Sequence, residues 1–190
     1  MQRLLSLSDG ITRLIEWIGR MAALLALPLM LVIVYDIISR KLLGIYPALS
    51  GSVWHISSTK LQEMEWHLHA VLFLLCLGYA YLRDRHVRIE LVRERFSPDL
   101  RAAIELLGCL LFLLPYCYLV ISFGIDFTAR AYHSGEVSAA LTGLPHRWLI
   151  KAMLPLGFSI LALAAMATVL RNIVLLFGQA DLRDQARSRP

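Results

Sequence analysis

Residues 152–170 read AMLPLGFSILALAAMATVL, a run of 19 residues without a charged side chain. A transmembrane helix needs about 20 mostly apolar residues, and residues 173–177 extend this run. Residues 106–125 form another uncharged run, while residues 21–35 and 68–82 contain no Asp, Glu, Lys or Arg. The sequence therefore predicts an all-α integral membrane protein with four transmembrane helices, at about residues 18–38, 64–82, 104–126 and 151–177.

The overall composition agrees with four spans. Of the 190 residues, 58% are apolar and 17% are charged, whereas soluble domains have about 45–50% and about 25%. This excess argues against a soluble enzyme, a disulfide scaffold and a disordered chain. Pro28, Pro115 and Pro155 fall within the apolar runs, where neighbouring helices can bond the carbonyl groups that proline leaves free. We therefore expect the helices to continue past these prolines.

The distribution of Lys and Arg predicts the orientation of the chain. Residues 1–20, 83–105 and 171–190 hold 13 of the 19 Lys and Arg residues, and the loops at 36–65 and 126–151 hold six. Because cytoplasmic flanks are enriched in these residues, we place both termini and the central loop in the cytoplasm. The net charge of +5 then reflects topology and contact with anionic phospholipid, and we expect no nucleic-acid partner.

Residues 1–178 are expected to form a single four-helix membrane domain, followed by a polar, frayed cytoplasmic tail over 179–190. The N-terminal segment has an apolar stripe at helical spacing, made of Leu4, Leu7, Ile11, Leu14, Ile15 and Ile18. This pattern predicts a short amphipathic helix lying in the membrane plane, with Ser8 as its N-cap. The alternative is a long, tilted first span. Ser97, Pro98 and Asp99 predict the start of a helix that runs into the third span.

The predicted spans contain little that could carry chemistry. Ionisable groups in the middle of a membrane are costly and usually functional, but these spans offer only hydroxyls such as Ser122, Ser159 and Thr168. The three cysteines form no Cys-x-x-Cys motif and are expected to be small packing residues. Small residues also permit close helix contacts, for which the candidates are Gly78, Ala80, Ala162, Ala164 and Ala165.

We therefore predict no catalytic residue, no cofactor and no metal site, and a helper subunit in place of an enzyme. Two alternatives remain open at this point. One is a membrane-anchor subunit of a redox complex, which a haem absorption band would reveal. The other is a free-standing small transporter, which would carry a substrate without partners.

Several motifs, spread in order over the four spans, carry a family resemblance. They include Leu61-Gln62-Glu63-Met64-Glu65-Trp66-His67-Leu68, Gly78-Tyr79-Ala80-Tyr81, His86-Val87-Arg88-Ile89-Glu90, Glu136-Val137-Ser138, Gly143-Leu144-Pro145 and Leu154-Pro155-Leu156-Gly157-Phe158. Together they resemble the small membrane subunit, the DctQ-like subunit, of tripartite ATP-independent periplasmic (TRAP) transporters. The resemblance extends from about residue 15 to residue 178.

This resemblance implies a role in the bacterial inner membrane. Such transporters import organic acids (carboxylates) on a sodium gradient. A periplasmic substrate-binding protein captures the substrate, and a large permease subunit of about a dozen spans carries it. The small subunit packs against the fixed scaffold of the large subunit, holds no substrate or sodium site, and is a candidate contact for the docked binding protein.

Two groups of residues are candidates for interaction. The first is expected near the periplasmic end of the bundle, as a structural or partner-facing surface: Glu63, Glu65, Trp66, His67, Glu136, Trp148 and Lys151. Simpler interpretations are favourable helix-dipole charges for Glu63 and Glu65, a snorkelling anchor for Lys151, and an interfacial aromatic for Trp66 and Trp148. Lys151 is also a candidate partner of Glu136. The second group, Arg85, Arg88 and Arg93, is expected to contact lipid headgroups at the cytoplasmic face.

Overall fold

The computed structural model describes residues 1–47, 56–83, 96–140 and 142–187, and within these ranges the chain contains helices and no strand. The helices are α1 (Gln2–Ala23), α2 (Ala26–Ile45), α3 (Ser58–Leu82), α5 (Pro98–Gly108), the π-helix η2 (Cys109–Leu113), α6 (Leu114–His133), α7 (Trp148–Phe177) and α8 (Ala180–Arg187). The all-α class predicted from the sequence is confirmed. The three arginines at 85, 88 and 93 lie outside the described residues.

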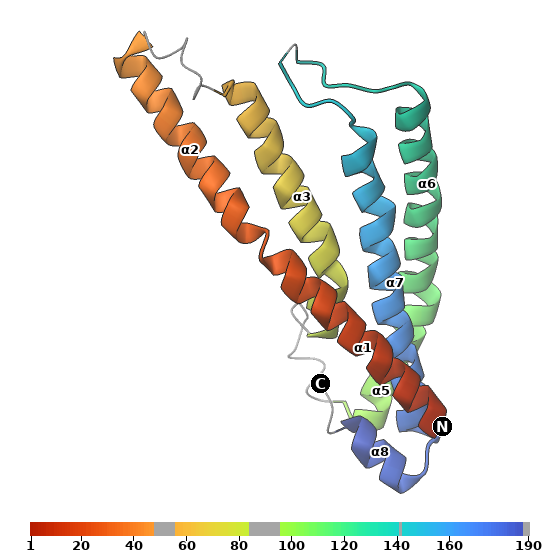
Figure 1. The fold of residues 1–190 in the computed structure, drawn as a ribbon. Helices are drawn as coiled ribbons and strands as arrows, with labels where there is room; N and C mark the ends of the chain where they lie inside the picture. Colours follow the sequence, from red (N-terminus) through yellow and green to blue (C-terminus); the bar gives the residue numbers. More distant parts are fainter. Residues whose placement is uncertain (48–55, 84–95, 141, 188–190) are drawn as a thin grey trace.

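Four helical stretches are long and apolar enough to cross a membrane, as the sequence predicts: Gln2–Ile45, Ser58–Leu82, Pro98–His133 and Trp148–Phe177. In Figure 1, α1 and α2 follow one another along a single diagonal, and α3 returns beside α2. The loop between α6 and α7 lies at the end opposite the N terminus and α8. We call these the loop end and the terminal end. The assignment of the terminal end to the cytoplasm stays a prediction.

Helix α7 is the centre of the bundle and contacts α1, α3, α5, α6 and α8. Glycines allow this close approach at three places. A Cβ atom added at Gly157 would lie 2.7 Å from the carbonyl oxygen of Leu74, one at Gly78 would lie 2.9 Å from Ile160, and one at Gly124 would lie 3.1 Å from Pro155. Ala164 and Ala165 are fully buried. The prediction of small-residue contacts is thus confirmed for Gly78 and these two alanines.

The prolines alter the helices locally without ending the spans, as expected. Pro28 cannot donate a hydrogen bond to Leu24, and the chain makes a short turn at Leu24 and Leu25 with i→i−3 bonds such as Leu24 N to Met21 O, at 3.2 Å. Pro115 likewise cannot bond to Leu111, and the helix widens just before it into η2. The tighter i→i−3 turn and the wider π-helix are both local changes that occur in helices where the regular i→i−4 bonding is interrupted.

The residues that α1 buries differ from those of the apolar stripe that predicted an amphipathic surface helix. Its buried residues are Leu5, Ser8, Ile15, Gly19 and Ala22, whereas Leu7 and Leu14 are exposed. Ser8 does not cap the helix, because α1 begins at Gln2 and the Ser8 hydroxyl donates to the carbonyl oxygen of Ala167 at 2.9 Å. The face is set by close packing of α1 on α3 and α7, which favours small side chains.

The sequence predicted the start of α5 but did not predict helix α8. The Ser97 hydroxyl accepts a bond from Leu100 N at 3.3 Å at the start of α5, which confirms the predicted cap. The tail, in contrast, is not frayed over 180–187, where it forms α8. Ala186 of α8 packs against Leu5 and Val174, so tertiary contacts stabilise a helix that its polar composition alone does not predict.

Helix α2 is joined to the bundle through one buried charge. Asp36 is the only buried residue of α2, and its side chain is fully inaccessible. Its carboxylate accepts hydrogen bonds from Arg40 and from the hydroxyl of Ser58 on α3, the latter at 2.9 Å. A buried carboxylate must be paired to remain charged. Arg40 pairs with it within α2, and the bond from Ser58 fixes the loop-end half of α2 to the first turn of α3.

The close approach of α7 to α3 gives a first prediction. Replacing Gly157 with Ala should destabilise the chain by about 1–3 kcal/mol, because overpacking forces a backbone shift where the new Cβ meets Leu74 O. Thermal unfolding in detergent measures the loss. The matched control is Gly10→Ala, since nothing lies within 4 Å of a Cβ at Gly10. Equal melting temperatures for the two variants would contradict the proposed packing constraint.

Candidate functional site

The loop end is built by the segment 134–147, which connects α6 to α7 and contacts the start of α3. Glu136 N bonds to Ala131 O at 3.0 Å, and Arg147 N bonds to Glu136 O at 3.2 Å, which closes the segment into a compact loop. Gly135 has a φ of +59°, a conformation that glycine adopts without strain. His146 has the same φ, which is uncommon for a residue with a side chain. The loop is therefore held by its own backbone before side chains are considered.

Glu63 of α3 is the centre of this end of the bundle. The residue is only 7% exposed. Its carboxylate accepts hydrogen bonds from the Ser138 hydroxyl, from the backbone N–H of Leu144, and from the guanidinium of Arg147 at 3.1 Å. Three donors from one loop thus converge on one carboxylate of another helix, which fixes the loop to α3.

Gly143 makes this arrangement sterically possible. A Cβ atom at this position would lie 2.3 Å from the Cβ of Ser138 and 2.8 Å from Oε1 of Glu63. Any side chain here would push the loop away from the carboxylate. The loop therefore supplies the hydrogen-bond donors for Glu63, and Gly143 leaves room for the Glu63 carboxylate.

Arg147 extends the cluster to the aromatic residues of α3. Its guanidinium also donates to the Ser138 hydroxyl, at 3.3 Å, and its Cζ lies 5.5 Å from the centre of the Trp66 ring. That distance is within the range of cation–π attraction. Trp66 in turn packs on His67, with ring centres 3.8 Å apart. The loop, Trp66 and His67 consequently form one connected surface.

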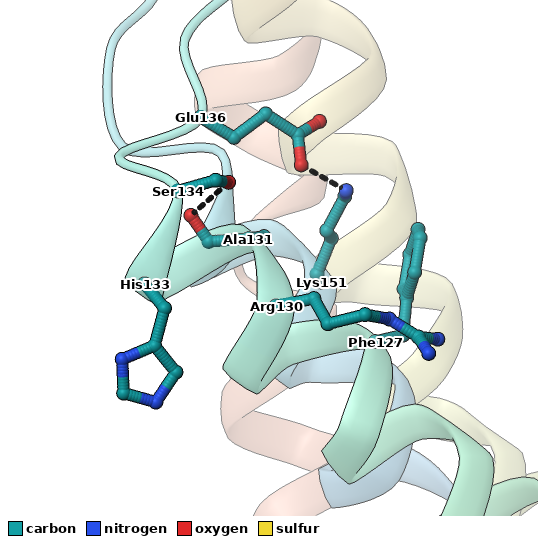
Figure 2. Close-up of a pocket in the computed structure, with 7 residues that line it drawn as sticks. All are labelled: Phe127, Arg130, Ala131, His133, Ser134, Glu136 and Lys151. Atoms are coloured by element: carbon teal, nitrogen blue, oxygen red, sulfur yellow. Dashed lines mark hydrogen bonds and ion pairs between the residues drawn. The ribbon is translucent and has the colours of Figure 1, made fainter.

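Lys151, near the start of α7, forms an ion pair with Glu136, as considered from the sequence. Figure 2 shows the two side chains directed toward one another beside the end of α6. The Nζ atom of Lys151 also lies 3.9 Å from the centre of the Phe127 ring. This pair ties the loop to α7 just as Glu63 ties it to α3.

The remaining candidates are placed differently. Trp148 packs edge to face against Tyr132, with ring centres 5.4 Å apart, as expected of aromatics near a membrane surface. Glu65 makes no hydrogen bond or ion pair with another described residue. Six of the seven candidates therefore take part in contacts at the loop end, and Glu65 is a half-buried acid available to a partner.

The central residues of the cluster were only partly visible in the sequence. The structure adds Arg147, Ser138 and Gly143, none of which we predicted as site residues. Gly143 and Arg147 precede the candidate Lys151 by eight and four residues, but only folding brings them to a glutamate more than 70 positions earlier. Chemically, the Glu63 carboxylate is occupied by donors, so the cluster acts as a structural clasp.

The first prediction for this site concerns Glu63. Glu63→Gln should lower the free energy of unfolding by about 2–4 kcal/mol, because it leaves the Arg147 guanidinium poorly compensated. Thermal unfolding and limited proteolysis of segment 134–147 measure the effect. Glu65→Gln is the control on the same helix and should change neither. If both variants were equally stable, the clasp would not hold the loop.

A second prediction concerns Lys151 and Glu136. A double-mutant cycle with Lys151→Met and Glu136→Gln should give a coupling energy of about 0.5–1 kcal/mol, because the pair is partly exposed and solvent weakens the attraction. The cycle is measured by thermal unfolding in low salt and in high salt, where the coupling should fall. Additive effects of the two substitutions would show that the ion pair does not stabilise the loop.

Comparison with known proteins identifies the family. Neither the curated proteins nor the solved structures gave a significant match to the chain. A family model, described as the DctQ component of tripartite ATP-independent periplasmic transporters, matches residues 29–175. This range contains α3, α5, η2, α6 and the loop-end cluster, and most of α2 and α7. With most of its length matched, the chain belongs to the DctQ family and is a small permease subunit of a TRAP transporter.

Proposed function

We propose that this chain is the non-catalytic small subunit of a sodium-driven, binding-protein-dependent importer of organic acids in a bacterial inner membrane. In this role it stabilises the fixed scaffold of the large permease subunit. Its loop end faces the periplasm and contributes to docking of the substrate-binding protein. The observation that carries the proposal is the match of residues 29–175 to the DctQ component of these transporters.

The clasp supports a docking role, because a preorganised loop loses little conformational entropy on binding. Glu63, Arg147 and Ser138 hold segment 134–147 on α3, and Lys151 with Glu136 holds it on α7. The half-exposed Trp66 ring lies against the loop residue Arg147, and Glu65 directly precedes Trp66 on α3. Together they present one acidic and one aromatic group to a partner, on a surface that is already ordered.

The interior of the bundle supports a helper role. The hydroxyls of Ser159 and Thr168 in α7 donate to the carbonyl oxygens of Pro155 and Ala164, at 2.7 and 3.1 Å. Such bonds to the preceding turn satisfy the hydroxyl within its own helix. These two hydroxyls therefore do not line a polar pathway through the bundle. A chain that carried substrate by itself would need such a pathway.

The exposed surface of α2 supports contact with a second membrane protein. Apart from Asp36, the helix has no buried residue, and Leu31 is 70% exposed. Figure 1 shows α2 leaning away from α6 and α7. Such a face is suited either to lipid or to the apolar scaffold of the large subunit.

Reconstitution tests the proposed function. Carboxylate uptake into proteoliposomes should require the chain, a co-purifying large subunit of about a dozen spans, the binding protein and an inward sodium gradient. The chain by itself should give no flux. Flux through the chain alone, or a haem absorption band in the purified complex, would instead support one of the alternative functions.

A charge reversal tests the loop-end surface within that complex. Glu65→Lys should lower recovery of the assembled transporter with its binding protein roughly tenfold, because an unfavourable charge at an interface costs on the order of 1.4 kcal/mol or more. The control, Asp181→Lys, makes the same charge change on α8 at the terminal end and should leave recovery unchanged. Normal assembly and uptake by Glu65→Lys would exclude this acid from the interface.

A further inference from the structure

A cavity of about 600 Å³ lies at the loop end between α6 and α7. The polar residues that line it include Arg130, His133, Ser134, Glu136 and Lys151. Figure 2 shows the Arg130 side chain extending along this cavity beside Phe127. The lining of this cavity is thus largely polar and includes two basic side chains, Arg130 and Lys151.

A second, more apolar cavity of about 510 Å³ shares Phe127 and Arg130 with the first. Its other lining residues come from α6 and α7, toward the middle of the span, and include Tyr116, Leu119, Val120, Phe123 and Leu154. The two cavities therefore adjoin at Phe127 and Arg130. One is polar and lies at the end of the helix, and the other is apolar and runs along it.

The charges at this junction favour an anion. Lys151 is neutralised by Glu136, so these two groups leave no net charge. The Arg130 side chain makes no hydrogen bond or ion pair with another described residue, and Asp126, one helical turn earlier, does not pair with it. The Arg130 guanidinium consequently has its donors available at the boundary between the two cavities.

The aromatic residues place this junction at the depth of lipid phosphates. Tyr132 and Trp148 pack together at the loop end, and such residues are enriched where the hydrocarbon core meets the headgroups. Arg130 lies two residues before Tyr132 on α6. The polar cavity is therefore at headgroup level, and the apolar one lies beside the hydrocarbon.

We propose that these adjoining cavities are a phospholipid-binding site. The phosphate diester of the lipid accepts hydrogen bonds from the Arg130 guanidinium, with the Lys151–Glu136 pair at the side of the headgroup. One acyl chain lies along the groove lined by Leu119, Val120 and Phe123. The site does not include the arginines at 85, 88 and 93, and it does not depend on the proposed transport function.

Lipid retention tests the proposal. The chain is purified from membranes in mild detergent, with any subunit that remains bound, and phospholipid is counted by native mass spectrometry and by lipid extraction. Arg130→Gln should lower affinity for the bound lipid about tenfold, because hydrogen bonds from a charged donor are lost. Leu119→Trp, which fills the apolar groove and keeps the charge, should also lower retention.

The control is Lys41→Gln, which removes an exposed cation at the loop end of α2 and should leave the bound lipid in place. Unchanged lipid retention by both Arg130→Gln and Leu119→Trp would overturn the proposal. Displacement by inorganic phosphate alone would also overturn it, since that result indicates a free-anion site. Loss of the large subunit from Arg130→Gln without loss of lipid would assign this surface to a protein contact instead.

Discussion

The bundle depends on how closely its other helices can approach α7. In a membrane the hydrophobic effect does not drive helices together, because the lipid chains are themselves apolar. Helix association therefore depends on tight packing of small residues. Of the residues in the most apolar stretch of α7, 44% are buried, against 6–11% in the other three spans. Gly157 and Gly78 bring α3 onto α7, and Gly124 does the same for α6. Helices α1, α5 and α8 also pack against α7.

The start of α3 is where the polar contacts of the loop end converge. Ser58 bonds the buried Asp36 of α2, and Glu63 bonds the loop that precedes α7. Both carboxylates are removed from solvent, and both are satisfied by donors from other elements, as a buried charge requires. Two charges that lie apart in the sequence therefore join three segments, α2, α3 and the loop before α7, at one end of an otherwise apolar bundle. That end is the one we propose to meet the binding protein.

Much of the fold followed from local sequence patterns. Uncharged runs predicted the spans, and the Ser97-Pro98-Asp99 sequence predicted the start of α5, because both signals depend only on neighbouring residues. The buried face of α1 did not follow, because Ser8 and Gly19 are buried by contact with α7 and α3 and not by their own polarity. Helix α8 was missed for a similar reason, since Ala186 is held by Leu5 and Val174. In the candidate site, the sequence indicated Glu63, Trp66, Glu136 and Lys151 but not Arg147, Ser138 or Gly143, which join them.

Composition and hydropathy predicted a four-span, all-helical chain with little polar chemistry at depth, and the ordered motifs indicated the DctQ family. Those properties depend on composition and on spacing along the chain. Only the tertiary structure decided which charges meet. Glu63 and Arg147 are distant in the sequence, as are Asp36 and Ser58, and nothing in local hydropathy selects these partners. The packing of α3 against α7 on one side and against α2 on the other selects them, because it fixes which side chains share a buried space.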